Sequence, residues 1–397
     1  MSKWNTYRIK DVVKLISIKT DDLSLPYIAL DNIVSWDATF VSSNSSSDGN
    51  SNECESGDVL FGKLRPYLAK GYIPTEKSIC SPEFLVLRPE KIIHNRFLLY
   101  FLLSKSFIFY IRNQVAGVKM PRTNWTQLGS YSITLPPVEE QKVIAGYLDR
   151  ECGKIDRKIE LLERKDDAYS RLRRSLINRA VTRGLNPDVA LKQSNLQWMP
   201  LIPGHWEIGR IRNYFNFRSE KVSEMDYSPL SVTKNGVVPQ MENVAKSLAG
   251  GDSRKKVCKD DFVVNSRSDR KGSCGTSPLD GSVSLIYIVL EPKYIDPKFV
   301  DYYFRCNDWV EEFYRNGKGI VADLWTTNYS IMRNIEIAIP PIEEQQQIAT
   351  YLDEKCGKIE AIIEKIGKEV ERLKELKRSL INETVTGKRA INHIPRC

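Results

Sequence analysis

The stretch that decides the fold is "PPVEEQKVIAGYLD" at residues 136–149, because the chain repeats it as "PPIEEQQQIATYLD" at residues 340–353. A shift of 204 residues aligns residues 135–184 with residues 339–388 without a gap, and half or nearly half of these positions are identical. The two copies also share "CGKI" and "RSLIN". A single repeat with a period of half the chain indicates duplication into two equivalent units, whereas solenoids repeat at short periods.

Each copy has the pattern of a long amphipathic helix. Apolar or small residues recur at alternating steps of four and three, which is typical of a seam between two helices. The stripe is imperfect in the first copy, where Asp166 stands in the place of Val370. A Pro-Pro pair and two glutamates open each helical run and basic residues close it, as expected for the two ends of a helix. The residues that we expect in the seam are Leu148, Ile155, Ile159, Leu162, Leu352, Ile359, Ile363, Ile366 and Val370.

The length of the two helices predicts that they pair with each other. About 40 residues at ~1.5 Å per residue form a rod on the order of 60 Å long, which one small domain cannot cover. Periodicity alone does not distinguish a parallel from an antiparallel pair. Short connections between domain, helix, domain and helix favour an antiparallel coiled coil, with the domains at opposite ends and approximate two-fold symmetry.

Outside the helices the repeat is faint. "WNTYRI" at 4–9 resembles "WEIGRI" at 206–211, and "TNW" at 123–125 resembles "TNY" at 327–329. Short β-like runs at 57–61, 84–89 and 282–292 alternate with helix-like stretches at 97–111 and 297–314, which predicts an α+β fold for each half. A Ser/Asn-rich loop is expected at 41–52 and a linker at 183–206. The predicted organisation is a globular domain at 1–135, a long helix at 136–184, a linker and second globular domain at 185–338, a long helix at 339–389 and a tail at 390–397.

Length and charge bound the class of protein. With 397 residues the chain exceeds one compact core, so two or more domains are expected. Lys and Arg number 59 against 50 Asp and Glu, for a net charge of +9. This balance favours a polyanionic partner but is also compatible with a merely basic protein.

The sequence predicts a cytoplasmic protein with reduced thiols. Its N-terminus is polar where a signal peptide needs an apolar core. The most apolar segment, 97–111, is too short to span a bilayer and contains Lys105, so we interpret it as one buried helix. Eight cysteines without C-x-x-C spacing and three histidines argue against a zinc site.

Motifs for catalysis are missing from the sequence. No Gly-Lys pair is followed by Ser or Thr, as a phosphate-binding loop requires, and neither Pro-Pro pair follows Asn or Asp, as in amino-methyltransferases. The nearest candidate for a nuclease carboxylate cluster, "SPEFLVLRPEK" at 81–91, is more typical of a strand. The three histidines lack partner patterns. We therefore predict a chain that is not an enzyme and holds no cofactor.

Basic loops carry the remaining chemical signal. They lie at 60–72, 117–125, 253–261 and 265–275. Arg and Lys bind phosphates or guanine edges, and Asn pairs with adenine, although a charge run is often only a solvated surface. The residues that we expect to contact DNA are Lys63, Arg65, Lys70, Lys119, Arg122, Asn124, Arg254, Lys255, Lys256, Arg267, Arg270 and Lys271.

These features together resemble a known family. "PPVEEQ" and "PPIEEQ", the "RSLIN" ends, and the loops "GDVLFGKLRPYLAK" and "DDFVVNSRSDRKGSCG" are similar to those of the specificity (S) subunits of type I restriction-modification systems, over essentially the whole chain and in the same order. The resemblance implies two target recognition domains, each reading half of a bipartite site in double-stranded DNA. It also implies that the antiparallel coiled coil sets their spacing and that its seam residues, named above, take part in docking two methyltransferase (M) subunits.

The same resemblance assigns the chemistry to partner subunits. The M subunits would use S-adenosylmethionine to methylate a flipped-out adenine on each strand, and two restriction (R) subunits would supply ATP-driven translocation and Mg²⁺-dependent cleavage. The two similar helices would then bind two identical methyltransferase subunits. The two diverged domains would read two different half-sites. Two alternatives stay open from the residues: a coiled-coil assembly protein that binds another polyanion or a protein, and a nuclease.

Overall fold

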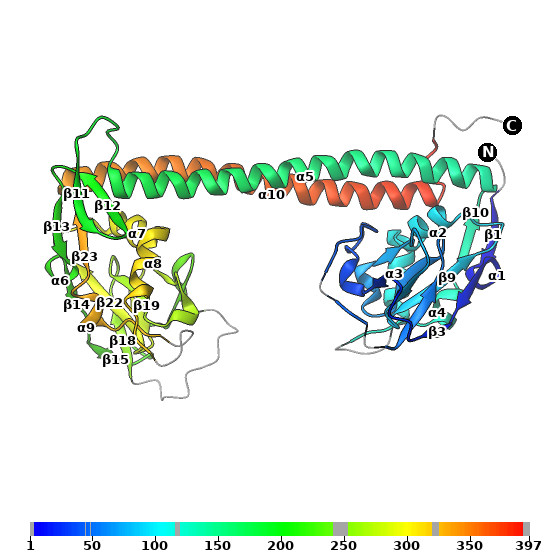
Figure 1. Ribbon diagram of the computed structural model, residues 1–397, viewed down its shortest axis with the longest axis horizontal. Coiled ribbons are helices and arrows are strands. Elements are labelled where there is room, and N and C mark those ends of the chain that lie inside the picture. Colours follow the sequence, from blue (N-terminus) through cyan, green and yellow to red (C-terminus); the bar gives the residue numbers. More distant parts are fainter. Residues whose placement is uncertain are drawn as a thin grey trace. The chain divides into compact units, whose positions relative to one another are not determined.

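The computed structural model describes residues 4–43, 45–47, 49–115, 120–240, 253–319 and 325–391 (Figure 1). The chain forms two compact units. Unit 1 comprises Met1–Glu163 and Ile366–Cys397, and unit 2 comprises Arg164–Lys365. Each long helix therefore contributes one half to each unit. The predicted tail lies outside the described residues from 392 onward.

Unit 1 is built on two small antiparallel-rich sheets. One has the strand order β2-β9-β6-β7 (Val13–Ile16, Phe84–Pro89, Val59–Gly62, Gly71–Tyr72). The other has the order β3-β5-β8-β4 (Lys19–Thr20, Ser51–Cys54, Ser78–Cys80, Tyr27–Ile28), with β4 parallel to β8. A separate strand pair, β1 (Asn5–Arg8) with β10 (Ser132–Leu135), joins the start of the chain to the strand that leads into the first long helix.

The helices of unit 1 cover the first sheet and correct one expectation. Residues 97–111 do not form one helix but belong to two, α2 (Asn95–Leu102) and α3 (Lys105–Gln114). Ser104 separates them because its side chain accepts the amide N–H of Phe107 and so begins a new helix. Two short helices, α1 (Ile9–Val12) and α4 (Trp125–Gly129), complete the unit together with the short 3-10 helices η1 (Leu30–Asn32) and η2 (Pro66–Leu68).

Unit 2 repeats this arrangement. Its four-stranded sheet β14-β22-β19-β20 (Phe215–Phe217, Tyr287–Pro292, Phe262–Asn265, Cys274–Thr276) has the same order of equivalent strands, and β13 (Glu207–Arg210) pairs with β23 (Glu336–Ile339) as β1 does with β10. A second sheet, β15-β18-β21, uses Lys221–Val222, Arg254–Val257 and Gly281–Val283, beside the pair β16 (Leu230–Thr233) and β17 (Gly236–Pro239). The helices are α6 (Ile211–Tyr214), α7 (Pro297–Arg305), α8 (Asn307–Arg315) and α9 (Tyr329–Met332), with η3 at Ser268–Arg270. The α+β class is confirmed in both units.

Two segments of unit 2 differ from expectation. The predicted linker at 183–206 contains a hairpin of β11 (Leu191–Leu196) and β12 (Met199–Pro203), and its last residue, Trp206, is fully buried. The apolar residues of this segment fill the core of unit 2, so the segment is ordered. The run 282–292 is not one strand, since β21 ends at Val283 and β22 begins at Tyr287.

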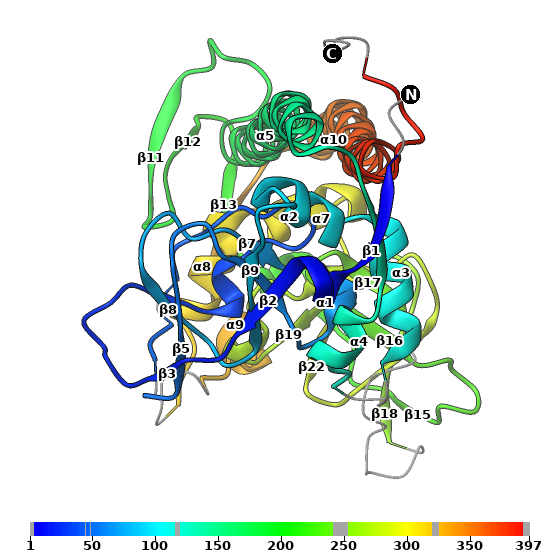
Figure 2. The same cartoon turned by 90° about the vertical axis from the view of Figure 1, so that its right-hand side faces the viewer.

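The long helices are α5 (Val138–Arg183) and α10 (Ile342–Val385). In unit 1 the first part of α5 packs on the last part of α10: Ile144 and Leu148 share a core with Leu380 and Val385. In unit 2 the last part of α5, at Val181, shares a core with the first part of α10. The two helices are thus antiparallel in each unit, as predicted, and Figure 2 shows them side by side above the sheets of unit 1. None of the helices described is long and apolar enough to cross a membrane.

Candidate nucleic-acid interface and helix anchors

Two basic loops of unit 1 that are distant in sequence are joined through their backbones. The N–H of Arg65 donates to the carbonyl of Pro121 at 2.8 Å, and the N–H of Thr123 donates to the carbonyl of Lys63 at 3.0 Å. Leu64 and Arg122 face each other in this short antiparallel bridge. The structure therefore brings together Lys63, Arg65 and Arg122, all three predicted to contact DNA.

The three side chains differ in how free they are. Arg65 is exposed, has a left-handed backbone with φ of 48°, and its guanidinium makes no hydrogen bond or ion pair with the residues that the structure describes. Arg122 is exposed but pairs with Glu83 at 2.8 Å. Lys63 is half-buried, and this burial lowers the pKa of its ammonium. Arg65 is thus the cation of this loop that is best presented to a ligand.

Two other predicted DNA contacts in unit 1 have structural partners. The ammonium of Lys70 donates to the carbonyl of Leu30 at 2.7 Å. The side chain of Asn124 accepts the N–H of Gln127 at 2.9 Å and caps α4, with Gln127 reaching back to the N–H of Asn124. The spacing N-x-x-Q in the sequence could have predicted this helix cap. Lys119 lies outside the described residues.

Unit 2 builds the same loop pair from a different sequence. The N–H of Ser268 donates to the carbonyl of Trp325 at 2.9 Å, and the N–H of Thr327 donates to the carbonyl of Ser266 at 2.9 Å. Arg267 faces Thr326 in the bridge. The two halves therefore share a loop scaffold whose side chains differ.

The basic residues of the second loop pair are exposed or half-buried, and each lies near a carboxylate. Arg267 lies 3.0 Å from Asp269, Arg270 lies 3.9 Å from the same carboxylate group, and Lys271 lies 2.6 Å from Glu311. Arg267 and Arg270 keep much of their surface in solvent. By the register of the two bridges Ser268 takes the place of Arg65, so the exposed arginines of the second loop pair occupy other positions on the same scaffold.

The three cations of strand β18 are held within the fold. Arg254 donates to the hydroxyl and carbonyl of Ser282 at 2.8 and 3.1 Å. Lys255 is buried, which lowers the pKa of its ammonium, and it donates to the carbonyl of Tyr287 at 2.5 Å. Lys256 pairs with Glu220 at 3.1 Å. These contacts favour a structural role, which a run of basic letters does not reveal.

Sequence reasoning missed the exposed apolar side chains at the same loops. Met120 and Tyr67 flank the loop pair of unit 1, and Trp325 belongs to the pair of unit 2; all three are exposed. Large exposed apolar side chains beside cations are typical of nucleic-acid surfaces, where they stack on or wedge between bases. An aromatic residue or Met beside a basic loop in the sequence could have indicated these side chains as candidate contacts.

The repeated "EEQ" of the two copies is explained by buried glutamines. Gln141 is fully buried; its amide donates to the carbonyls of Pro136 and Ile92 at 2.8 and 3.0 Å and accepts the N–H of His94 at 2.8 Å. Gln345 repeats this with Pro340 at 2.8 Å and with the N–H of Asp296 at 2.8 Å. Each glutamine ties the start of a long helix to the segment before α2 or α7.

The second glutamate of each copy binds a tryptophan. Glu140 accepts the indole N–H of Trp4 at 3.2 Å, and Glu344 accepts that of Trp206 at 3.2 Å. The opposite helix ends at the same place, since a Cβ on Gly387 would lie 3.1 Å from the Trp4 ring. These Glu–Trp hydrogen bonds fix the point at which the globular part of each unit contacts the long helices.

The predicted seam residues are buried to different degrees. Burial is nearly complete for Leu148, Leu352, Ile359, Ile366 and Val370 and partial for Ile155, Ile159, Leu162 and Ile363. Ion pairs cross the seam at Lys158–Glu369, 3.0 Å, and Arg173–Glu360, 2.6 Å. Some exposed positions of the long helices carry the same residue in both copies of the repeat. One such pair is Leu172 and Leu376, which are 46% and 51% exposed.

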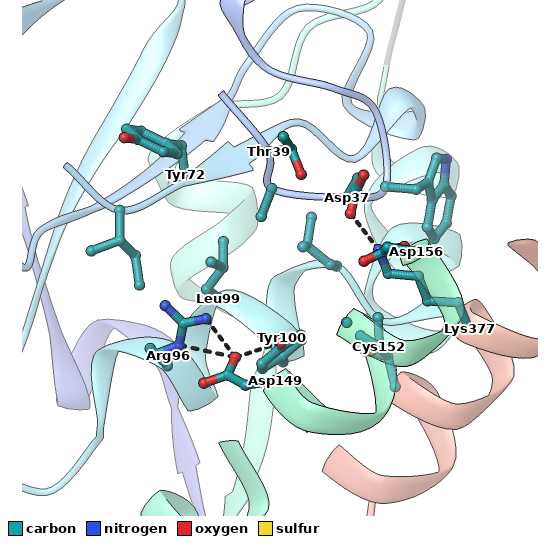
Figure 3. A pocket seen from close by; sticks show the side chains of 16 residues that line it. Asp37, Thr39, Tyr72, Arg96, Leu99, Tyr100, Asp149, Cys152, Asp156 and Lys377 are labelled. Atoms are coloured by element: carbon teal, nitrogen blue, oxygen red, sulfur yellow. Dashed lines mark hydrogen bonds and ion pairs between the residues drawn. The ribbon is translucent and has the colours of Figure 1, made fainter. Parts of the chain in front are cut away.

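A cavity of about 240 Å³ lies between the helices and the first domain in unit 1 (Figure 3). Its walls include two ionic clusters. In one, Asp149 binds Arg96 and the hydroxyl of Tyr100, and in the other Lys377 binds Asp37 and Asp156. Both clusters are already paired within the chain.

The described residues contain no group of three or more His, Cys, Asp or Glu placed to hold a metal ion. Burial raises the pKa of the Cys152, Cys274 and Cys306 thiols to about 12, so they stay protonated at neutral pH.

The chain matches one family twice. The profile described as "Type I restriction modification DNA specificity domain" matches residues 1–168 and again residues 205–372. The chain is 28% identical over 359 residues to the putative type I restriction enzyme MjaX specificity subunit of Methanocaldococcus jannaschii, covering 84% of this chain and 78% of that protein. It is 21% identical over 311 residues to the type I restriction enzyme StySPI specificity subunit of Salmonella potsdam, covering 76% and 67%.

Solved structures share the fold. A chain from a structure of a type I R-M system has a TM-score of 0.69 at 18% identity, covering 97% of this chain and 98% of that one. The HsdS subunit from Thermoanaerobacter tengcongensis has a TM-score of 0.51 at 18% identity, covering 98% of both chains.

Proposed function

Since the chain belongs to the family of type I restriction-modification DNA specificity proteins, we propose that it reads a bipartite target in double-stranded DNA for a modification and restriction complex. The domain at residues 1–135 reads one half-site, and the domain within 185–338 reads the other. The observation that carries this proposal is the pair of equivalent loop bridges, one in each unit, with Arg65 exposed on one and Arg267 and Arg270 on the other.

The two half-sites are addressed by different side chains on one scaffold. Arginine reads guanine edges bidentately and also binds phosphates. Because the loop scaffold is duplicated while its cations are not, the two domains recognise different bases. In this proposal the paired helices set the spacing between the two half-sites, which lie one helical turn, ~34 Å, from each other.

The long helices dock two methyltransferase subunits. The seam residues are largely covered by the partner helix, so we assign docking to outward-facing positions that are the same in both copies. Leu172 and Leu376 are such a pair, since they are equivalent by the repeat and both exposed. Two identical surfaces suit two copies of one partner.

The chain itself is not catalytic in this proposal. S-adenosylmethionine belongs to the methyltransferase subunits, and ATP and Mg²⁺ belong to two restriction subunits. The paired carboxylates and protonated thiols described above support this division. The complex acts in the cytoplasm, where its DNA lies.

The test is the salt dependence of duplex binding by the chain in complex with its methyltransferase. Contacts to about six phosphates weaken binding on the order of a thousandfold between ~50 and ~200 mM salt. A flat dependence would favour the alternative of a coiled-coil assembly protein that binds a protein partner. Incubation of the chain alone with Mg²⁺ and DNA should leave the DNA intact, and cutting would show a nuclease instead.

A further inference from the structure

The ammonium of Lys377 joins three segments of unit 1. Lys377 lies on α10 and is only 7% exposed. It donates to both carboxylate oxygens of Asp156 on α5, at 2.6 and 2.7 Å, and to the carboxylate of Asp37 in the first domain (Figure 3). Burial alone would lower the pKa of Lys377, but the two carboxylates outweigh it and raise the pKa, so the side chain is charged at neutral pH.

The loop that carries Asp37 is shaped around this contact. Its neighbours Trp36 and Ala38 both have left-handed backbones, with φ of 64° and 61°. Such conformations are uncommon for residues other than glycine and persist where surrounding contacts impose them. A second contact is the guanidinium of Arg378, which stacks over the Trp36 ring at 4.8 Å. The helix α10 therefore holds this loop at two adjacent residues.

The same loop supports the loop that carries Arg65. The N–H of Trp36 donates to the carbonyl of Ala69 at 3.1 Å. Ala69 directly follows the short helix η2, and Arg65 directly precedes it. On the other side, the ammonium of Lys70 binds the carbonyl of Leu30 in η1. A short run of hydrogen bonds thus leads from the long helix to the exposed arginine.

This arrangement is only partly duplicated. The repeat places Arg173 at the position of Lys377 and Glu360 at that of Asp156, and these two residues pair at 2.6 Å. Arg174, the counterpart of Arg378, donates instead to the carbonyl of Ser170 in its own helix at 3.4 Å.

We propose that Lys377 is a positioning residue for DNA reading by the first domain: its contact with Asp37 fixes the 36–38 loop on the long helices, and this loop sets the position of Arg65. The inference rests on the proposed DNA-reading function. It assigns a half-site-specific role to a helix residue that does not touch DNA. Substitutions in this cluster then affect one half-site and spare the other.

The test uses the chain in complex with its methyltransferase and the target defined by methylation sequencing. Affinity is measured for the intact duplex and for duplexes altered in one half-site at a time. Asp37→Asn leaves the Lys377–Asp156 pair in place, so the helix pair is preserved. We expect about a tenfold loss of discrimination at the first half-site, the scale of a misplaced arginine–base contact, and unchanged discrimination at the second.

Two further variants separate positioning from stability. Lys377→Met should act as Asp37→Asn does, and Lys377→Arg should restore discrimination because it keeps the charge. Lys158→Met removes the ion pair with Glu369 from the same helix pair and should change neither half-site. Unchanged discrimination in folded Asp37→Asn, or an equal loss at both half-sites, would overturn the inference. A wild-type complex without discrimination at either half-site would overturn the proposed function itself.

Discussion

The hydroxyl of Tyr100 lies 2.7 Å from a carboxylate oxygen of Asp149 and fastens α2 to α5. Tyr302 and Asp353 repeat this bond at 2.9 Å between α7 and α10. The contacts between globular part and helix are therefore duplicated together with the helices, although the globular sequences have diverged. The duplication preserved the contacts that attach each domain to the long helices, whereas the sequences of the basic loops diverged.

Replacing Gln345 by Leu should destabilise unit 2. The change leaves the N–H of Asp296 and the carbonyl of Pro340 without their partner, and each unpaired buried group costs ~1–3 kcal/mol. We expect the free energy of unfolding to fall by about 2–4 kcal/mol in urea. Gln346→Leu is the control, because Gln346 is the next residue and is exposed. Equal stability of the two variants would contradict the assigned role.

Acid should weaken unit 1 through His94. Burial first, then the charges of Lys142 and Arg96, lower the pKa of His94 below its ordinary value. Between these two pKa values His94 is protonated in the unfolded chain but neutral in the folded chain. The free energy of unfolding therefore decreases as pH falls from about 6.5 through the lower pKa of the folded state. His94 stands at the N-cap of α2 without a side-chain cap bond, so His94→Asn places a favourable N-cap residue there and removes the titration. The drop in Tm between about pH 7.5 and 5 should be smaller in the variant; identical drops would refute this.

Arg65→Ala should weaken DNA binding chiefly at the half-site that is read by the domain at residues 1–135, the first half-site. Loss of a base contact costs ~1–3 kcal/mol, and loss of a phosphate contact reduces the salt slope by about one. The measurement is titration of duplexes altered in one half-site at a time. An unchanged affinity in the variant would contradict the assignment of this loop to DNA binding.

Leu172→Glu and Leu376→Glu should each remove one methyltransferase from the complex. A charge at an exposed anchor of an interface costs on the order of 2 kcal/mol or more. Native mass measurement of the complex gives the stoichiometry directly. Leu161→Glu is the control, because Leu161 is 57% exposed but its repeat counterpart is Lys365. Loss of binding in the control alone would place the docking surface elsewhere.

The long helices could be predicted because two independent signals coincide in them. The duplication marks their extent, and the spacing of Leu148, Cys152 and Ile155 marks their buried face. The antiparallel pairing followed from connection length. Local signals also sufficed for the strand 84–89, which is β9 as predicted.

The surroundings of the candidate binding residues were harder to predict, because a charged residue in the sequence can be exposed or can be buried against a partner in the fold. Lys255 belongs to a basic run yet is buried in β18 against the carbonyl of Tyr287. The contact between Asp37 and Lys377 spans 340 residues, and nothing local announces it. Only the fold brings such groups together.

The most direct test of two independent reading domains on one duplicated frame is an exchange of residues 1–135 for the equivalent domain of a relative. The hybrid is expressed with its methyltransferase, and the methylated sites of the host DNA are sequenced. We predict that one half of the bipartite target changes while the other half and the spacer length stay the same. A change in both halves, or in the spacer alone, would contradict the account.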